Sequence, residues 1–422
     1  MKKVAMIFSR FPCYDEAFIL RELLALERLL DLVVFSLKKS SREPVRHAVG
    51  NGLAERAIYA GLLLDRNVLG ENCRLFFTRP REYLAMVFSV IRMNWRDAEF
   101  LCKSLACIPR AVYFAAVCRK RGIEHVHGQW ATYPALTAFC ISRINRIPFS
   151  FTGHAHDIHV KTVGLGEKLR RAAFVITCTA DNKRHLLGLA PETSPDKIRI
   201  IYHGIDLENY RLKGKIAAPG RAGRPAGGEA PGDGAFHILS AGSLFECKGF
   251  EYLIDACALL AEEKFDFHCR IIGGGYLEER LKTIVREKNL ESRITFTGYQ
   301  AQEEMPRHYR WADIFILPAV LRIHWGIPNV LLEALAVGVP VACTPLPSLP
   351  ELIDNPFCGF AIAEKDPRAI ADLVKRVSGN PELLRRYGRS GRKKIEQLWD
   401  IRVTSRQIAD LFSSSLIFPP EK

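Results

Sequence analysis

The chain of 422 residues lacks several patterns that would point to common kinds of site. None of its 12 cysteines forms a C-x-x-C pair, which argues against a zinc site or a disulfide framework and for a reducing cytoplasm. No apolar run reaches the ~20 residues that cross a bilayer, and the first one, 4–8, is too short for a signal peptide. No D-x-D carboxylate pair follows an expected strand, so no metal is implied.

What the chain does contain is an ordinary globular composition, 48% hydrophobic and 25% charged. Its length exceeds what a single core usually serves and favours two domains. Short apolar segments alternate with helical patterns, which predicts parallel sheets with right-handed crossovers. The expected strands are 4–8, 32–37, 125–127, 149–152, 174–177, 198–202, 236–241, 268–272, 294–297, 314–317 and 339–343.

Residues 213–235, rich in Gly, Pro and Ala, indicate a flexible linker between these two sets of strands. We therefore expect an α/β fold with one Rossmann-like domain over 1–212 and another over 236–385. Residues 386–422 complete the chain, with helices expected at 382–398 and 402–414. Two doubly wound domains are expected to face each other across a cleft, where ligands bind at the carboxyl ends of the strands.

The net charge of +14 is concentrated in the first half of the chain. Residues 1–212 hold 32 basic and 20 acidic side chains, whereas residues 213–422 hold 28 and 26. The segment 74–121 has ten basic and three acidic residues among aromatic and aliphatic ones. Such a segment can lie on an anionic membrane surface or simply turn its apolar face to the core, and both interpretations stay open. Nucleic acid is not indicated, because no recognition motif accompanies the charge.

The most informative segment, residues 326–344, reads as a loop, a helix, a two-residue turn and a buried strand. Pro328 suits the first turn of a helix, because its missing N–H would be unpaired there. Gly338 ends the helix, and a short apolar strand of the parallel kind follows. The helix start offers unpaired N–H groups and a positive dipole end to a phosphate. Glu333, in the second turn, can instead accept hydrogen bonds from a diol.

This segment resembles the donor-site helix of GT-B glycosyltransferases of the retaining family 4 (glycosyl transferases group 1), especially exopolysaccharide and colanic-acid types. The resemblance implies that the C-terminal helices cross back to the first domain and that Glu333, the second glutamate of the family's E-x7-E pattern, binds the donor ribose. Trp325 replaces the first glutamate, which implies a donor sugar stacked on the indole or a weakened activity; Arg322 and His324 are nearby polar substitutes. The N–H groups suited to phosphate or sugar oxygens are those of Gly326, Ile327, Asn329 and Val330.

A glycine turn of the second domain carries a candidate cation. Gly242 and Ser243 follow the expected strand 236–241, and Lys248 can place a point charge on a diphosphate. In the family, an arginine after the glycine and the lysine clamp the diphosphate, so Ser243 leaves half of that clamp missing. Lys248 is then expected to assist departure of the diphosphate, although an ordinary turn with a solvated lysine has the same pattern.

Gly274 lies in the next glycine turn, residues 273–275, which resembles the family's G-x-G turn. The full G-x-G-x-x-G fingerprint is absent because Glu278 stands at its last position, which disfavours a nicotinamide enzyme. Gly298 and Tyr299 follow the strand after that, where the family shapes a pocket for the nucleotide base.

In the first domain, residues 151–158 follow a buried strand and resemble the family's F-T-x-H-A-x-D-I motif. The histidine of that motif lies beside the donor sugar, so His154 is a candidate catalytic residue, although lone histidines are usually structural. Asp157 is expected to orient the loop. Glu16 lies in a loop that resembles the family's acceptor-side F-P-x-x-x-E-x-F-I, and His127 ends another strand; Glu16 can equally be a helix-start carboxylate.

The resemblance implies a hexosyltransferase-type enzyme that moves a sugar from a nucleoside diphosphate sugar to a polysaccharide intermediate, lipid-linked in view of the basic first half. It implies retention of configuration, no metal or other cofactor, and a cytoplasmic protein held on the inner face of the cell membrane. Exopolysaccharide or lipopolysaccharide biosynthesis is the expected setting. The alternatives are a weakened GT-B protein that binds a nucleotide sugar or scaffolds a partner transferase, and a sugar-nucleotide epimerase or hydrolase.

Overall fold

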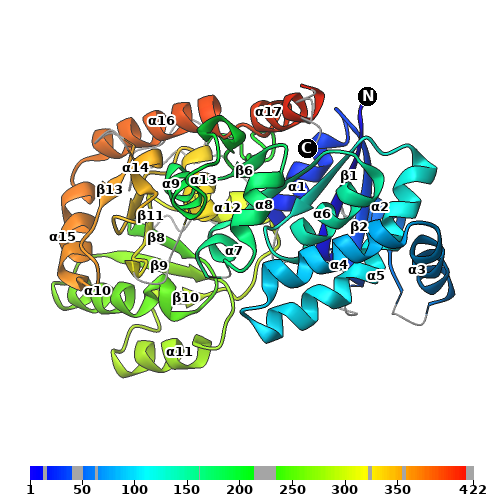
Figure 1. The fold of residues 1–422 in the computed structure, drawn as a ribbon. Coiled ribbons are helices and arrows are strands. Elements are labelled where there is room, and N and C mark those ends of the chain that lie inside the picture. The colour runs from blue at the N-terminus through cyan, green and yellow to red at the C-terminus, as the bar shows by residue number, and fades with distance from the viewer. Residues whose placement is uncertain are drawn as a thin grey trace. The chain divides into compact units, whose positions relative to one another are not determined.

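The computed structural model describes residues 1–12, 17–39, 51–61, 65–160, 162–212, 234–321, 326–353 and 358–414 (Figure 1). Contacts divide the chain into two compact units. Unit 1 comprises Met1–His203 with Arg402–Lys422, and unit 2 comprises Gly204–Ile401. Residues 204–212, assigned to the first domain on sequence, thus group with unit 2, where Ile205 pairs with Asp400. The expected linker at 213–235 falls almost wholly outside the described residues.

Unit 1 is built on a seven-stranded sheet in the order β3-β2-β1-β4-β5-β6-β7, and every pairing in it is parallel. Parallel strands covered on both faces are buried along their whole length, and the central β4 and β5 are buried at every residue, polar side chains such as His127 and Ser150 included. The strands are β1 (Lys3–Phe11), β2 (Asp31–Lys39), β3 (Ile58–Tyr59), β4 (His125–Gln129), β5 (Phe149–Gly153), β6 (Val175–Thr177) and β7 (Ile198–Ile200).

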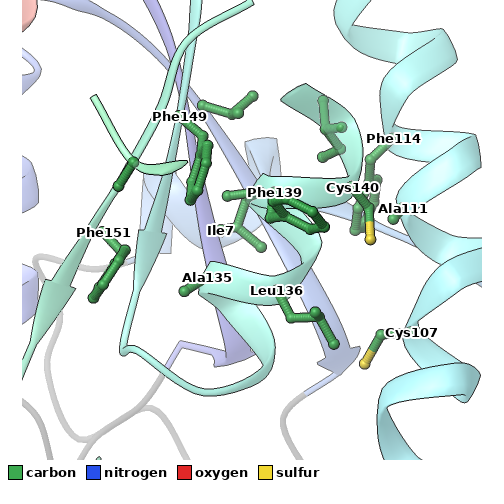
Figure 2. Close-up of a cluster of buried hydrophobic side chains, with 14 of the residues drawn as sticks. Ile7, Cys107, Ala111, Phe114, Ala135, Leu136, Phe139, Cys140, Phe149 and Phe151 are labelled. Atoms are coloured by element: carbon green, nitrogen blue, oxygen red, sulfur yellow. The ribbon is translucent and has the colours of Figure 1, made fainter. Parts of the chain in front are cut away.

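Helices cover this sheet and complete the core of unit 1. They are α1 (Ala17–Leu26), α2 (Asn51–Arg56), α3 (Arg66–Thr78), α4 (Pro80–Asn94), α5 (Ala98–Arg121), α6 (Tyr133–Asn145), α7 (Ala155–His159), α8 (Leu165–Arg171), α9 (Ala180–Leu189) and α17 (Ile401–Ser413), with a short 3-10 turn, η3 (Pro195–Lys197). Figure 2 shows α6 packed between the sheet and α5. The buried side chains labelled there include Ile7, Ala111, Phe114, Leu136, Phe139, Phe149 and Phe151.

Unit 2 has a six-stranded parallel sheet in the order β10-β9-β8-β11-β12-β13. Its strands are β8 (Phe236–Ala241), β9 (Phe267–Ile272), β10 (Ile294–Phe296), β11 (Ile314–Leu317), β12 (Val341–Cys343) and β13 (Phe360–Ala361). Its helices are α10 (Phe250–Glu262), α11 (Glu278–Glu287), α12 (Met305–Trp311), α13 (Asn329–Ala336), α14 (Leu349–Leu352), α15 (Pro367–Ser378) and α16 (Pro381–Leu398), with a 3-10 turn η4 (Glu246–Lys248). The predicted α/β class with two parallel-sheet domains is therefore confirmed.

All of the expected strands are present: two have the expected bounds, and the ends of the others shift by at most three residues. The sequence missed β3 and β13, edge strands of two residues each, which are too short for a hydrophobic pattern to reveal. The sequence predicts Pro328 in the first helical turn, whereas α13 begins one residue later and Pro328 is its N-cap. The described cysteines all carry free thiols.

Helix α5 bears on the expectation that no apolar stretch has membrane-spanning length. Among the described residues, it is the one helix that is long and apolar enough to cross a membrane, judged by the length and composition of its most apolar part alone. Only 44% of that part is buried, and α5 packs against α3, α4 and α6. Lys103 and Arg110 interrupt its apolar sequence, which is why no uninterrupted run was visible. Length and composition alone do not separate a membrane span from a core helix of this kind.

Candidate functional site

The carboxyl edge of the unit 2 sheet is formed by glycine turns whose backbones touch. After β8, the N–H of Gly242 donates to Ile272 O at 2.9 Å, and the N–H of Leu244 donates to Gly274 O at 3.0 Å. A Cβ on Gly273 would lie 1.9 Å from Gly242 O, and Gly273 has φ of +139°. Only glycine fits such a close approach with this backbone conformation. The two turns therefore act as one rigid main-chain surface.

The turn after β10 joins the same surface, because the N–H of Gly273 donates to Gly298 O at 3.0 Å. Gly298 has φ of +66°, and a Cβ there would meet no atom of the described residues within 4 Å. The same holds for Gly274. Tyr299 is 49% exposed beside this open space. The structure thus brings the predicted Gly242, Gly274 and Gly298 to one edge of the sheet.

Lys248 lies at the end of η4, against the first of these turns. A Cβ on Gly242 would lie 3.5 Å from Cε of Lys248, so the lysine stem runs along the glycine backbone. The N–H of Val320 donates to Cys247 O at 3.0 Å, which ties this turn to the end of β11. Burial lowers the pKa of Lys248. An anion bound beside the ammonium would oppose that shift, which is the chemistry of a phosphate site.

Glu333 is held in place by a residue that the sequence did not single out. Its carboxylate is largely buried, with the residue 8% exposed, and Oε2 accepts a hydrogen bond from the hydroxyl of Tyr309 at 2.9 Å. Tyr309 belongs to α12 and is fully buried. This hydrogen bond orients the carboxylate and occupies one of the roughly four acceptor positions that a carboxylate has. No sequence signal marked Tyr309, because it lies 24 residues away on another helix.

The start of α13 is described only in part. Gly326 has φ of +86°, and Ile327, Asn329 and Val330 are partly buried. Asn329 Oδ1 has no hydrogen-bond partner among the described residues. The predicted Trp325, with Arg322 and His324, lies outside them, so the roles expected for these residues stay predictions.

The far end of α13 is fixed by α16. A Cβ on Gly388 would lie 2.1 Å from Gly338 O, so the two backbones touch where α13 turns into β12. Arg392 Nη1 donates to Tyr210 O at 2.6 Å and also to Ala336 O. A cation at the C-terminal carbonyls of a helix is favourable for its dipole. The helix that carries Glu333 is therefore anchored at its end by α16 and by the residues just after the unit boundary.

In unit 1, His154 lies at the carboxyl edge as the N-cap of α7 and is 5% exposed. Its ring lies 4.3 Å from that of Trp130 and 5.3 Å from that of His203, measured between centroids. Burial lowers the pKa of His154 well below its usual range and lowers that of His203 to about 4. Nε2 of His154 has no hydrogen-bond partner within the described ranges. The ring is thus a neutral imidazole in an aromatic cluster.

Asp157 and Lys168 hold the loop that presents this cluster. Oδ2 of Asp157 accepts from the N–H of Ala131, and Nζ of Lys168 donates to the carbonyl of the same residue. Burial raises the pKa of Asp157 to about 7 and lowers that of Lys168 to about 8. The adjacent Trp130 has φ of +90°, an unusual value for a large side chain. The loop-orienting role expected for Asp157 agrees with these contacts.

His127, expected on the acceptor side, lies in the interior of unit 1. It is 1% exposed, Nδ1 is 2.7 Å from Ser150 Oγ, and Nε2 is 2.9 Å from Thr152 Oγ1. Burial lowers its pKa to about 3. These are the surroundings of a structural histidine. Glu16, the other acceptor-side residue, lies outside the described residues, so both assignments stay predictions.

Another buried carboxylate near this edge was not anticipated. Glu22 of α1 is 9% exposed and hydrogen-bonds Gln129, the last residue of β4. Burial raises its pKa to about 7. Its position within the apolar pattern of α1 gave no sign of a polar contact, because the partner comes from a strand more than a hundred residues later.

Two known families match parts of the chain. Residues 229–394 match Glycosyl transferases group 1, and residues 74–209 match Glycosyltransferase Family 4. The amylovoran biosynthesis glycosyltransferase AmsK of Erwinia amylovora is 32% identical over 219 residues, 51% of this chain and 50% of AmsK. A D-inositol 3-phosphate glycosyltransferase of Streptomyces scabiei is 25% identical over 267 residues, 61% of this chain and 57% of that protein. The chain spans about half the length of these curated relatives.

Solved structures with the same fold are matched over the whole chain. Alr3699/HepE of Anabaena, crystallised in complex with UDP, has a TM-score of 0.70 at 16% identity, covering 98% of this chain and 100% of that one. A glycosyltransferase of Rickettsia africae has a TM-score of 0.70 at 14% identity, with 99% and 100% covered. The fold of this chain is therefore the two-domain GT-B fold that these structures share.

Proposed function

We propose that this chain, with a region of glycosyl transferases group 1 over residues 229–394 and one of Glycosyltransferase Family 4 over residues 74–209, transfers a sugar from a nucleoside diphosphate donor to a polysaccharide intermediate. The proposal rests chiefly on Glu333, a buried carboxylate aimed by Tyr309 from the helix of the expected donor motif. Two vicinal ribose hydroxyls are the natural donors to such a carboxylate, since charge-assisted hydrogen bonds are the strong ones.

The other residues of the unit 2 edge have roles along the donor. Lys248 and the N–H groups at the start of α13 meet the diphosphate, and the open space at Gly298 and Tyr299 takes the base. As the donor bond breaks, negative charge grows on the leaving diphosphate, and these groups stabilise it. His154 of unit 1 keeps the catalytic role that the family resemblance implies for it, as part of this proposal.

Retention of configuration and independence from metal belong to the same proposal. Front-face attack through an oxocarbenium-like state needs no protein nucleophile, and the leaving phosphate itself accepts the proton of the acceptor hydroxyl. The acceptor is a lipid-linked polysaccharide intermediate at the inner face of the cell membrane. The similarity to AmsK, named for amylovoran biosynthesis, supports a role in exopolysaccharide assembly.

The deciding experiment is a thermal-shift screen of nucleoside diphosphate sugars, starting with UDP-glucose and run with a chelator present. At a thousandfold excess over the dissociation constant, a true donor stabilises the protein by about 4 kcal/mol. The shift should disappear in Glu333→Ala and Glu333→Gln and persist in Glu287→Ala, a change on the exposed C-terminal end of α11. A shift that survives in both Glu333 variants would contradict the proposed site, and a shift lost to the chelator would contradict metal independence.

A second candidate is a weakened GT-B protein that binds the nucleotide sugar or supports a partner transferase. It is motivated by Ser243, exposed where the family has the clamp arginine, and by Trp325 in place of the first glutamate. Turnover of Trp325→Glu separates the two. Restored transfer would indicate a decayed site, whereas loss of transfer would indicate that the tryptophan belongs to a working one.

A further inference from the structure

Exposed apolar side chains gather on one part of unit 1. Seven of the 16 large apolar side chains that are exposed in the described residues lie between Leu69 and Trp95. On α4 and just after it, Leu84, Phe88, Ile91 and Trp95 are 56%, 65%, 38% and 63% exposed. Their spacing of four, three and four residues places them in one stripe along the helix. A soluble surface rarely exposes so continuous an apolar stripe without a function.

The same helix already has a separate face for the core. Met86, Val90 and Asn94 are buried, and Tyr83 and Val87 pack partly buried against the core of unit 1. The two interpretations left open by the sequence therefore apply to different residues of one helix. The core-facing explanation accounts for the buried face and leaves the exposed stripe unexplained.

Helix α3 extends the stripe. It exposes Leu69, Phe76 and Phe77, with Phe77 79% exposed. The ring of Phe76 meets that of Tyr83, at the start of α4, edge to face at 5.7 Å. The exposed residues of α3 and of α4 with Trp95 thus form adjoining surfaces, which we name the α3–α4 apolar face. Figure 1 shows both helices in the blue-to-cyan part of unit 1.

The charge around this face is predominantly positive. Residues 65–96 contain six arginines and three acidic side chains. The acids are engaged within the protein: Asp65 caps α3, Glu71 pairs with Arg74, and Glu82 pairs with Arg79.

Two arginines flank the stripe on α4. Arg81 and Arg96 are exposed at its two ends, and the Arg96 guanidinium lies 5.3 Å from the centre of the Trp95 ring. An apolar stripe rimmed by arginines and ended by a tryptophan matches an anionic bilayer surface, where rings sit at head-group depth and arginines reach phosphates. A bilayer also needs no shape complementarity from a single convex helix.

We propose that the α3–α4 apolar face docks unit 1 on an anionic bilayer, with α4 lying along the interface. The inference rests on the proposed function in one respect, since it supplies the surface at which a lipid-linked acceptor is presented. The apolar side chains enter the boundary between head groups and acyl chains, and the arginines bind lipid phosphates. Binding then depends on both aromatic side chains and charge.

Vesicle co-sedimentation tests this with the full chain. Wild type should bind vesicles of phosphatidylcholine mixed with phosphatidylglycerol at low salt, and bind pure phosphatidylcholine far less. Replacing Phe77, Phe88 and Trp95 together by Ser should lower the partition coefficient at least about tenfold, because each ring contributes apolar area. Arg81→Gln with Arg96→Gln should weaken binding about fivefold per arginine, and only on anionic vesicles. The matched control replaces Leu189, Leu398 and Val403, exposed apolar residues on other helices, by Ser and should bind as wild type.

Two results would overturn the inference. One is the absence of vesicle binding by wild type, or equal binding by the triple aromatic variant. The other is a wild-type dimer in light scattering, without lipid, that becomes a monomer in the triple variant, since the face would then join two copies of the chain. The donor-induced thermal shift is measured on the same samples. Vesicle binding without a thermal shift from any nucleoside diphosphate sugar would contradict the proposed function and still support the docking surface.

Discussion

The carboxyl edge of the unit 2 sheet is formed mainly by glycine main chain, whereas that of the unit 1 sheet is formed largely by buried side chains. In unit 2 the strands end in glycine turns that hydrogen-bond to one another, so the edge is main chain at Gly242, Gly273 and Gly298. In unit 1 the edge carries buried ionisable side chains, including His154 and Asp157. A glycine edge lets backbone N–H groups come close to phosphate, and its geometry does not depend on pH. A side-chain edge has charge states that burial sets, so its geometry is coupled to protonation.

The difference between the two edges is tested most directly by substituting Gly273, where the largest loss of stability is expected. Gly273→Ala would place a methyl group 1.9 Å from Gly242 O with φ of +139°, so we expect a loss of about 3 kcal/mol or more in the free energy of unfolding. Gly274→Ala is the control, since its Cβ meets no described atom within 4 Å, and should change stability by less than about 0.5 kcal/mol. Urea denaturation followed by circular dichroism measures both. Equal stability of the two variants would show that the turns do not touch.

On the side-chain edge the largest effect is expected at Lys168. Lys168→Met removes the donor to Ala131 O and leaves Asp157 buried without its nearby cation. Leaving a buried carbonyl without its charged hydrogen-bond donor costs about 2 to 3 kcal/mol. Lys120→Met, at the exposed end of α5, should cost less than about 1 kcal/mol. Equilibrium denaturation at neutral pH distinguishes them, and a loss no larger than the control's would show that the loop is held by other contacts.

The coupling between stability and protonation in unit 1 can be tested at Glu22. Its pKa is raised to about 7 in the folded protein, so the stability it contributes is present at low pH and is lost as the pH rises through about 7. Glu22→Gln keeps the hydrogen-bonding shape without the charge. Its stability relative to wild type should therefore increase by about 2 kcal/mol between about pH 5.5 and about pH 8.5. Exposed Glu55→Gln should show no comparable trend in the same denaturation series, and a flat difference for Glu22→Gln would refute the coupling.

The smallest effect is expected in unit 2, at the hydrogen bond between Tyr309 and Glu333. Tyr309→Phe removes the hydroxyl that donates to Glu333 Oε2 and leaves the carboxylate in place. One hydrogen bond to a charged group should account for about tenfold in donor affinity, or about 1.4 kcal/mol. Titration calorimetry with the donor found by thermal shift gives the value. Tyr252→Phe on α10 is the control, and an unchanged affinity in Tyr309→Phe would mean that Glu333 is oriented by other contacts.

The sequence predicted the glycine edge better than the side-chain edge. Buried parallel strands are short apolar runs followed by turn residues, so the turns at 242, 273–275 and 298 could be found one by one. Tyr309 and Lys168 could not, because each acts through a tertiary contact with a residue far along the chain. The sequence predicts His127 at a strand end, like a site residue, whereas in the structure it is the middle residue of β4 and both its nitrogens lie within hydrogen-bonding distance of hydroxyls in the core.

The helices at 66–94 show a different limit. A helix with apolar residues on two faces has the same composition whether one face or both are buried, and periodicity does not tell which face meets the sheet. Met86 and Phe88 are two residues apart, and one is fully buried while the other is 65% exposed. The assignment of the faces needed the fold.

The packing of α16 against the end of α13, the helix that carries Glu333, determines where this chain can be joined to another in a chimera. Arg392 and Gly388 contact the end of α13, and Arg392 also donates a hydrogen bond to Tyr210 O. The segment that should be exchanged as one piece is therefore residues 204–401 rather than 236–385. A chimera that grafts a relative's donor specificity onto this chain should be joined at 203/204 and 401/402. Junctions placed inside those limits would pair the α13 of one protein with the α16 of another. The helix that carries the transplanted glutamate would then lose the contacts that fix its C-terminal end.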